Sequence, residues 1–311
     1  MAVSSINGMA IVRADRWRGE ASGGILGNSM ETNTVPLCEF ADGVRVPALG
    51  QGTATLGENA AQARREVSAL IAGLDLGMTL IDTAEMYGEG GAERVVGKAI
   101  AGRRDGVFLV SKAYPQNAGR RSLPAACERS LARLGTDHLD LYLLHWRGRI
   151  PLAETVDAFE TLVRAGKIRR WGVSNFDAAD MAELVALPDG ERCATNQVCY
   201  HLGERGIEWD LLPWMRARRM PLMAYSPLGQ AALLRDARLM QVAAAEGKTP
   251  AQLALAWTWR DDGVITIPQS ADVDHLRENR NAAGLRWTPA LAIALDRAFP
   301  PPTAPSRLAV L

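Results

Sequence analysis

Short apolar runs alternate with helical patterns along most of the chain. Eight runs have the length and composition of strands buried in a sheet, at residues 48–53, 78–82, 106–112, 138–145, 169–175, 194–200, 221–226 and 263–268. In the stretch between the first two runs, apolar residues recur at Val67, Leu70, Ile71 and Leu74. This spacing is that of one helix face, and Gly77 is expected to end the helix.

Three later stretches, at 122–135, 151–166 and 249–260, have the same helical character. A proline stands at or near the start of each, where its missing N–H costs a helix least, and Ser122 is expected to cap the first of them. Successive strands begin roughly 30 residues apart, which is the size of a βα unit. The chain therefore indicates repeated βα units.

Eight strands alternating with helices fit either a closed (β/α)8 barrel or an open, doubly wound sheet. The open sheet would normally place a GxGxxG turn after its first strand, and the segment "LGQGTATLG" does not match that pattern. The strand count and the length of 311 residues favour an α/β fold of the (β/α)8 TIM-barrel type in a single domain over residues 37–311. Residues 1–36 are Gly/Ser-rich without a clear period, and we expect them to be a poorly ordered extension with no secretory signal.

Charge and cysteine content exclude several classes of protein. Lys+Arg and Asp+Glu are both 35, so net charge gives no reason to expect nucleic acid or a membrane surface as partner. No apolar run approaches the roughly 20 residues that cross a bilayer. The four cysteines include no CxxC pair and no histidine at zinc spacing, so we expect no metal and a cytoplasmic location. A small molecule is the expected partner.

Polar side chains end every predicted strand from the second onward, and barrel chemistry takes place at those ends. These residues are Asp82, Lys112, His145, Ser174, Asn175, Asn196, Gln197, Tyr225, Ser226, Gln269 and Ser270, with Tyr87 in the loop after Asp82. Singly, an aspartate there can be a turn former, a lysine a solvated strand end and a histidine a core residue. Four ionisable types at the ends of three neighbouring strands indicate a site instead.

Asp82, Tyr87, Lys112 and His145 together suit proton donation to a carbonyl group. A phenol with a pKa near 10 is a weak acid, and a nearby ammonium group lowers that pKa. A carboxylate can hold the ammonium group in place, and an imidazole can orient the carbonyl oxygen. Since no side chain supplies hydride, a nicotinamide or flavin is required. One histidine and one acid leave too few ligands for a metal-dependent hydrolase.

The segments "IDTAEMYG", "LVSK", "LYLLHW", "GVSNF", "NQVCY", "AYSPLG" and "IPQS" occur in the order and spacing typical of one family. With these motifs the chain resembles the aldo-keto reductase superfamily, and "GVRVPALGQGT" resembles that family's opening segment, an N-terminal β-hairpin. The resemblance implies a barrel that binds NADP(H) without a Rossmann domain and reduces aldehydes and ketones to alcohols. The segment "HWRGRIPLAETV" is similar to that of bacterial reductases with broad carbonyl or diketo-acid ranges.

The resemblance also implies roles for individual residues. Tyr87 would be the proton donor of a catalytic tetrad, with Asp82 and Lys112 tuning it and His145 orienting the substrate. Trp146 would line the substrate pocket. The implied cofactor contacts are Ser174, Asn175 and Gln197 at the carboxamide, Tyr225 on the nicotinamide ring, Ser226, Leu228 and Gly229 beside the pyrophosphate, and Gln269, Ser270, Glu278 and Asn279 toward the adenosine.

The chain departs from the family pattern at the expected 2′-phosphate site. Gln269 replaces a common lysine and His275 a common arginine, with Arg277 and Arg280 as nearby substitutes. We therefore expect NADPH as the cofactor, with NADH as the alternative. Ala54 replaces a common tryptophan, which indicates a roomier pocket.

Two other readings of the same residues stay open, and so does the oligomeric state. One is a non-catalytic, cofactor-binding barrel that regulates a partner protein. The other is a hydrolase barrel that uses the same aspartate and histidine. A monomer or weak homo-oligomer is expected.

Overall fold

Eight parallel strands form the central sheet of this computed structural model, which describes residues 34–311. In sheet order they are β10 (Val264–Thr266), β9 (Leu222–Tyr225), β8 (Asn196–Cys199), β7 (Ile168–Ser174), β6 (Leu139–Leu144), β5 (Phe108–Ala113), β4 (Leu80–Asp82) and β3 (Gln51–Gly52). Each overlaps one of the eight predicted runs. The predicted extension over residues 1–36 lies almost entirely outside the described residues.

Backbone hydrogen bonds between the first and last strands close the sheet on itself. Gly50 N–H donates to the carbonyl of Thr266 at 2.8 Å, and Thr266 N–H donates to the carbonyl of Ala48 at 2.7 Å. A parallel bridge also joins Gly52 to Gln269. The prediction of a (β/α)8 barrel is therefore confirmed.

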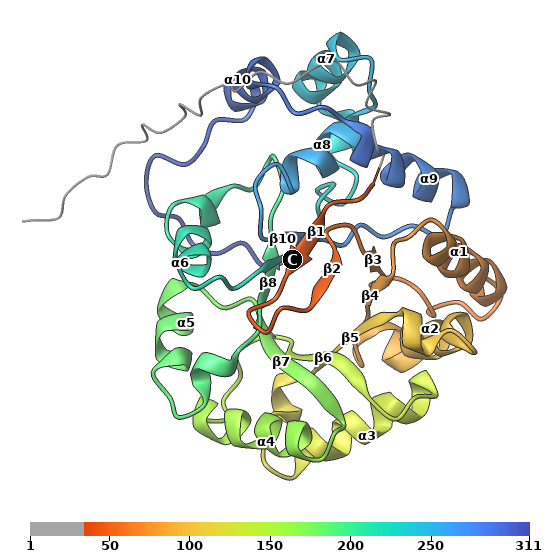
Figure 1. Cartoon of the computed structure of the whole chain (residues 1–311), viewed down its shortest axis with the longest axis vertical. Coiled ribbons are helices and arrows are strands. Elements are labelled where there is room, and N and C mark those ends of the chain that lie inside the picture. The colour runs from red at the N-terminus through yellow and green to blue at the C-terminus, as the bar shows by residue number, and fades with distance from the viewer. Residues whose placement is uncertain (1–33) are drawn as a thin grey trace, which may run out of the picture. The chain divides into compact units, whose positions relative to one another are not determined.

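Helices lie around the strands, as Figure 1 shows. They are α1 (Ala63–Asp75), α2 (Gly91–Ile100), α3 (Ser122–Leu134), α4 (Leu152–Arg164), α5 (Ala178–Val185), α6 (Leu211–Ala217), α7 (Ala237–Ala245), α8 (Pro250–Thr258), α9 (Val273–Asn281) and α10 (Pro289–Ala298). Short 3-10 helices are η1 (Tyr87–Gly90), η2 (Arg104–Gly106), η3 (Pro115–Asn117), η4 (Gly190–Arg192), η5 (Gly206–Glu208), η6 (Leu233–Arg235) and η7 (Ala282–Gly284). Within residues 34–311, no helix is long and apolar enough to cross a membrane.

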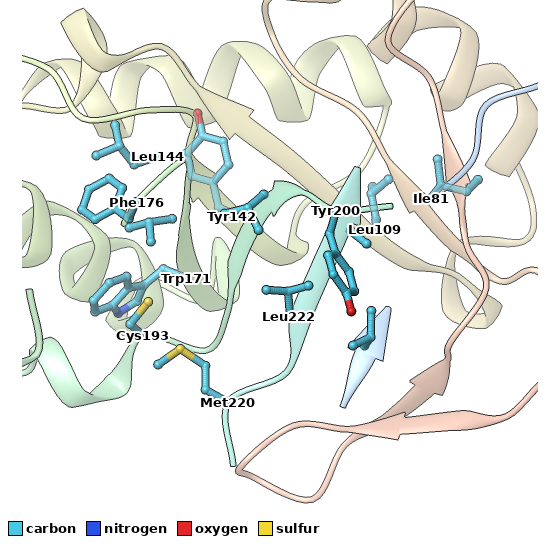
Figure 2. Packing of buried hydrophobic residues seen from close by; sticks show 14 of the residues in the cluster. Ile81, Leu109, Tyr142, Leu144, Trp171, Phe176, Cys193, Tyr200, Met220 and Leu222 are labelled. Carbon is cyan, nitrogen blue, oxygen red and sulfur yellow. The ribbon is translucent and has the colours of Figure 1, made fainter. Parts of the chain in front are cut away.

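Both faces of the strands are buried, which explains why their sequences read as continuous apolar runs. On β6, Leu141 and Leu143 belong to the interior of the barrel, whereas Tyr142 and Leu144 pack outward beneath the helices. Figure 2 shows Tyr142 and its neighbours in this outer layer. There the ring of Trp171 stacks on Phe159 with centroids 5.2 Å apart.

A hairpin of β1 (Leu37–Glu39) and β2 (Arg45–Pro47) closes the amino end of the barrel. Phe40, which follows β1, stacks on Phe108 at the start of β5 with centroids 5.4 Å apart. The guanidinium of Arg170 lies over both rings and pairs with Asp42 at 2.5 Å. Apolar side chains from β4, β5, β6, β9 and β10 pack together with this hairpin in the barrel interior.

One local prediction about helices is wrong. Ser122 does not cap α3, because its Oγ accepts a hydrogen bond from Gly119 N–H at 3.1 Å instead. On α1 the predicted apolar face is confirmed, since Leu70 is buried and Val67, Ile71 and Leu74 pack partly buried against the same core. Gly73 is buried on this helix as well. The side chain of Gln51 occupies the space that a side chain at Gly73 would need. Its Nε2 donates to the carbonyl of Met78 at 2.9 Å.

Candidate active site

A cavity of about 780 Å³ opens at the carboxyl end of the barrel. Most of the predicted site residues line it, namely Asp82, Tyr87, His145, Ser174, Asn175, Gln197, Tyr225, Ser226, Leu228, Gln269, Ser270, Glu278 and Asn279. Lys112 lies behind the cavity wall, and Gly229 and Trp146 are not among the lining residues. Strand ends far apart in sequence thus meet in one place, as parallel strands require.

Lys112 lies at the centre of a buried hydrogen-bond network. Its side chain is fully buried, and its Nζ donates to Asp82 Oδ2 at 2.6 Å and to the carbonyl of Thr83 at 3.0 Å. The third bond goes to the hydroxyl of Tyr87 at 3.1 Å. Burial alone would lower the pKa of Lys112, but Asp82 and Tyr87 together raise it above its usual value. The ammonium group therefore keeps its charge, and each of its three N–H donors forms a hydrogen bond with a fixed partner.

Tyr87 stands at the start of η1, where the backbone turns sharply. Gly88, Glu89 and Gly90 all have positive φ, at 54°, 52° and 80°, and this left-handed run follows the tyrosine directly. Burial raises the pKa of Tyr87 above its ordinary value, and the opposing effect of Lys112 does not cancel it. The sequence predicted a lowered pKa for Tyr87, because that prediction considered the charge of Lys112 and not the effect of burial. The phenol keeps its proton at neutral pH.

The ring of His145 contacts Tyr87 edge-on, with centroids 5.7 Å apart. Burial, followed by the charge of Lys112, lowers the pKa of His145 to about 3, so the imidazole is neutral. Its Nδ1 is buried without a hydrogen-bond partner within the described part of the chain. Nε2 is therefore the ring nitrogen available to a group in the cavity.

Trp146 supports His145 from outside the cavity. The two ring centroids are 5.0 Å apart, and Tyr114 packs edge-on against the indole at 6.0 Å. The indole is not among the residues that line the cavity, and it packs between His145 and Tyr114.

Titration of His145 makes the fold sensitive to acid. In the unfolded chain its pKa is close to the ordinary value of 6.5, whereas in the folded protein it is about 3. As the pH falls from about 6.5 to about 3, His145 binds a proton in the unfolded state and not in the folded state, so the free energy of unfolding decreases. We expect His145→Gln to lose less stability than the parent between pH 7.5 and pH 5 in urea titrations. Equal losses in both proteins would contradict the assignment.

Asn175 connects the histidine strand to Tyr225. Its φ of 60° lies in the left-handed region, which asparagine tolerates better than most residues. Its Nδ2 donates to the carbonyl of His145 at 3.1 Å, and its Oδ1 accepts from the hydroxyl of Tyr225 at 2.9 Å. The phenol ring of Tyr225 is thereby held at the cavity wall as a flat surface.

Gln197 reaches across the barrel to the tetrad residue Asp82. Its Nε2 donates to Asp82 Oδ1 at 2.7 Å, and its backbone carbonyl accepts from Ser174 Oγ at 2.8 Å. Sequence reasoning placed Gln197 only beside a cofactor. No sequence signal marks the contact, since the two residues are 115 positions apart.

At the other end of the cavity, Gln269 bridges two loops. Its Oε1 accepts from Thr55 N–H at 3.1 Å, and its Nε2 donates to Thr55 Oγ1. His275 lines the cavity nearby, on α9. Arg277 pairs with Asp274, and neither Arg277 nor Arg280 is among the lining residues. Of the predicted phosphate contacts, His275 is thus the basic side chain that faces the cavity.

Within residues 34–311, no cluster of His, Cys, Asp and Glu side chains is suited to hold a metal ion. Several residues that line the cavity were not predicted from the sequence. The unpredicted lining residues include Thr53, Thr55, Met86, Gln230, Ala231, Leu234, Pro250 and Leu311. Most stand in loops, where periodicity gives no signal. Gln230 and Ala231 have positive φ, at 51° and 67°, so the loop after β9 has an unusual backbone conformation.

A family model described as the Aldo/keto reductase family matches residues 48–296. Methylglyoxal reductase YeaE of Escherichia coli (strain K12) is 54% identical over 271 residues, covering 86% of this chain and 95% of that protein. Glyoxal reductase of Bacillus subtilis (strain 168) is 36% identical over 251 residues, covering 80% and 88%. An aldo-keto reductase from Klebsiella pneumoniae, solved in complex with NADPH, is 53% identical with a TM-score of 0.87, covering 89% of this chain and 100% of that one.

Proposed function

Because the chain belongs to the Aldo/keto reductase family, we propose that it reduces aldehydes and ketones to alcohols, with hydride from a nicotinamide cofactor and a proton from Tyr87. One observation carries the proposal: Tyr87 faces the cavity while its hydroxyl accepts a hydrogen bond from the buried, charged Lys112. A protonated phenol beside a fixed cation is the arrangement that proton donation to a developing alkoxide needs.

Four side chains, Asp82, Tyr87, Lys112 and His145, have different roles in the proton transfer. The carbonyl oxygen would accept hydrogen bonds from the hydroxyl of Tyr87 and from Nε2 of neutral His145, which orient it and polarise the C=O bond. Bound nicotinamide would supply the hydride. As negative charge grows on the oxygen, Tyr87 donates its proton. Lys112 then stabilises the phenolate, and Asp82 keeps Lys112 in position.

The cavity suits an extended dinucleotide, because residues at the tetrad and residues on α9 line the same space. Tyr225 would support the nicotinamide ring, with Ser174, Asn175 and Gln197 near its carboxamide. Ser226, Leu228 and Gly229 would lie beside the pyrophosphate. Gln269, Ser270, Glu278 and Asn279 would hold the adenosine end. The NADPH complex of the Klebsiella pneumoniae relative supports NADP(H), and His275, which lines the cavity, would meet a 2′-phosphate.

We propose small 2-oxoaldehydes such as methylglyoxal as the substrate class. The methylglyoxal and glyoxal reductases among the relatives support this choice. The cavity is lined by Ala54 and Met86, and none of its lining residues within 34–311 is a Lys or Arg that would favour a carboxylate substrate. The free, buried cysteines Cys38, Cys127, Cys193 and Cys199 fit a reducing, cytoplasmic location.

The test is oxidation of NADPH, followed at 340 nm, with methylglyoxal and with a nitrobenzaldehyde. We expect turnover with both substrates and a higher kcat/KM with NADPH than with NADH. Equal or better kcat/KM with NADH would contradict the cofactor assignment. Absence of turnover with every aldehyde, together with tight NADPH binding, would favour the non-catalytic barrel over the reductase.

A further inference from the structure

Gln197 contacts Asp82, the residue that holds Lys112, and a residue that only binds cofactor would not need this contact. Gln197 is 1% exposed and Asp82 is 2% exposed, so the 2.7 Å hydrogen bond between them is buried at the wall of the cavity. The direction of the amide is fixed by chemistry, because an ionised carboxylate only accepts hydrogen bonds and Nε2 must be the donor.

The two oxygens of Asp82 have different partners. Oδ2 accepts from Lys112 at 2.6 Å and Oδ1 accepts from Gln197 at 2.7 Å. β8, which carries Gln197, is separated from β4, which carries Asp82, by three strands in the sheet. The bond therefore spans the barrel rather than linking neighbours, and it sets the rotation of the carboxylate. That rotation in turn determines where Oδ2 holds the ammonium group beneath Tyr87.

We propose that Gln197 is a positioning residue of the proton-donating site, which holds Asp82 through Nε2 while its Oε1 stays available to the cofactor carboxamide. The inference rests on the proposed function, since it assigns Gln197 to the step in which Tyr87 gives up its proton. Without the amide donor, Oδ1 would be a buried charged oxygen with no partner, and the carboxylate would turn away from its place.

Two substitutions separate this role from cofactor binding. Gln197→Met keeps the length of the side chain and removes the donor, and we expect kcat at saturating NADPH to fall about 10- to 100-fold, as for loss of a hydrogen bond to a charged group. Gln197→Glu restores a donor only when protonated. Beside Asp82, and buried, the new carboxyl has a pKa above its ordinary value. It donates to Oδ1 at low pH and repels it at high pH.

The readout is the ratio of variant to parent kcat across pH 5.5 to 8.5, with NADPH affinity measured in parallel by fluorescence titration. For Gln197→Glu we expect a ratio near that of the parent at the acid end, falling by about tenfold or more at the alkaline end. For Gln197→Met the ratio should stay low throughout. Ser270→Ala is the matched control, because Ser270 lines the cavity at the adenosine end and does not touch Asp82. It should change NADPH affinity without changing the pH dependence.

The proposal is overturned if Gln197→Met keeps kcat within about twofold of the parent while NADPH affinity falls, or if the Gln197→Glu ratio is flat with pH. Failure of the proposed function would look different, since the parent protein itself would then show no aldehyde-dependent NADPH oxidation. Urea titrations of each variant show whether a lost rate reflects unfolding.

Discussion

Replacing Tyr87 with phenylalanine is expected to lower kcat for aldehyde reduction by about 10²- to 10⁴-fold, the usual contribution of a general acid. The substitution removes the hydroxyl and keeps the ring, so the edge-on contact with His145 survives. Lys112 loses one of three hydrogen bonds and retains Asp82. Steady-state rates at 340 nm measure the loss, and fluorescence titration is expected to show NADPH binding close to that of the parent.

A matched control removes a different phenolic hydroxyl. Tyr142 is fully buried on the outward face of β6, and it is not among the residues that line the cavity. Tyr142→Phe should therefore leave both turnover and NADPH binding unchanged. Parent-like turnover in Tyr87→Phe would show that the proton comes from another group, and the assignment of Tyr87 would be wrong.

Replacing Lys112 with methionine is expected to cost both activity and stability. The ammonium group is the ion-pair partner of Asp82, and both side chains are almost fully buried. Its removal leaves the carboxylate charged and held only by the amide of Gln197, which is expected to lower the free energy of unfolding by about 3–5 kcal/mol. Turnover should fall as well, because the phenolate of Tyr87 loses its stabilising charge. Urea titration and rate measurements at 340 nm test the two effects.

The double variant Asp82→Asn/Lys112→Met separates these effects. It removes the stranded negative charge, and we expect it to recover much of the lost stability while turnover stays low. A double variant no more stable than Lys112→Met would mean that the buried charge is not the cause of the destabilisation. Recovery of turnover would mean that the lysine is not needed for proton donation.

The position of the site was predictable from sequence because strand ends are easy to locate in a parallel barrel. Asp82, Lys112 and His145 each follow an apolar run, and such runs must finish at one rim. Properties that depend on how residues from different elements pack together were not predictable. The pKa of Tyr87 depends on how much burial opposes Lys112, and the bond from Gln197 depends on the width of the barrel.

Local packing explains the remaining differences between prediction and structure. On α1, Gly73 leaves room for the side chain of Gln51, a partner from another element that the apolar spacing of the helix does not predict. Trp146 follows His145 in sequence and was expected in the pocket, yet its ring packs beside the histidine and outside the cavity lining. At Gly73 the contact depends on a residue that is distant in sequence, and at Trp146 it depends on the direction of the side chain.

The hairpin at the amino end of the barrel has a kinetic consequence. Because Phe40, Phe108 and Arg170 pack together at that end, the described residues 34–311 leave the carboxyl end of the barrel as the side from which the cavity is reached. Two ligands that use one opening must bind and dissociate in a fixed order whenever one of them blocks the path of the other. Under the proposed function, a product lying between the cofactor and this opening would have to leave first, and the slower of the two departures would limit the rate of repeated turnover.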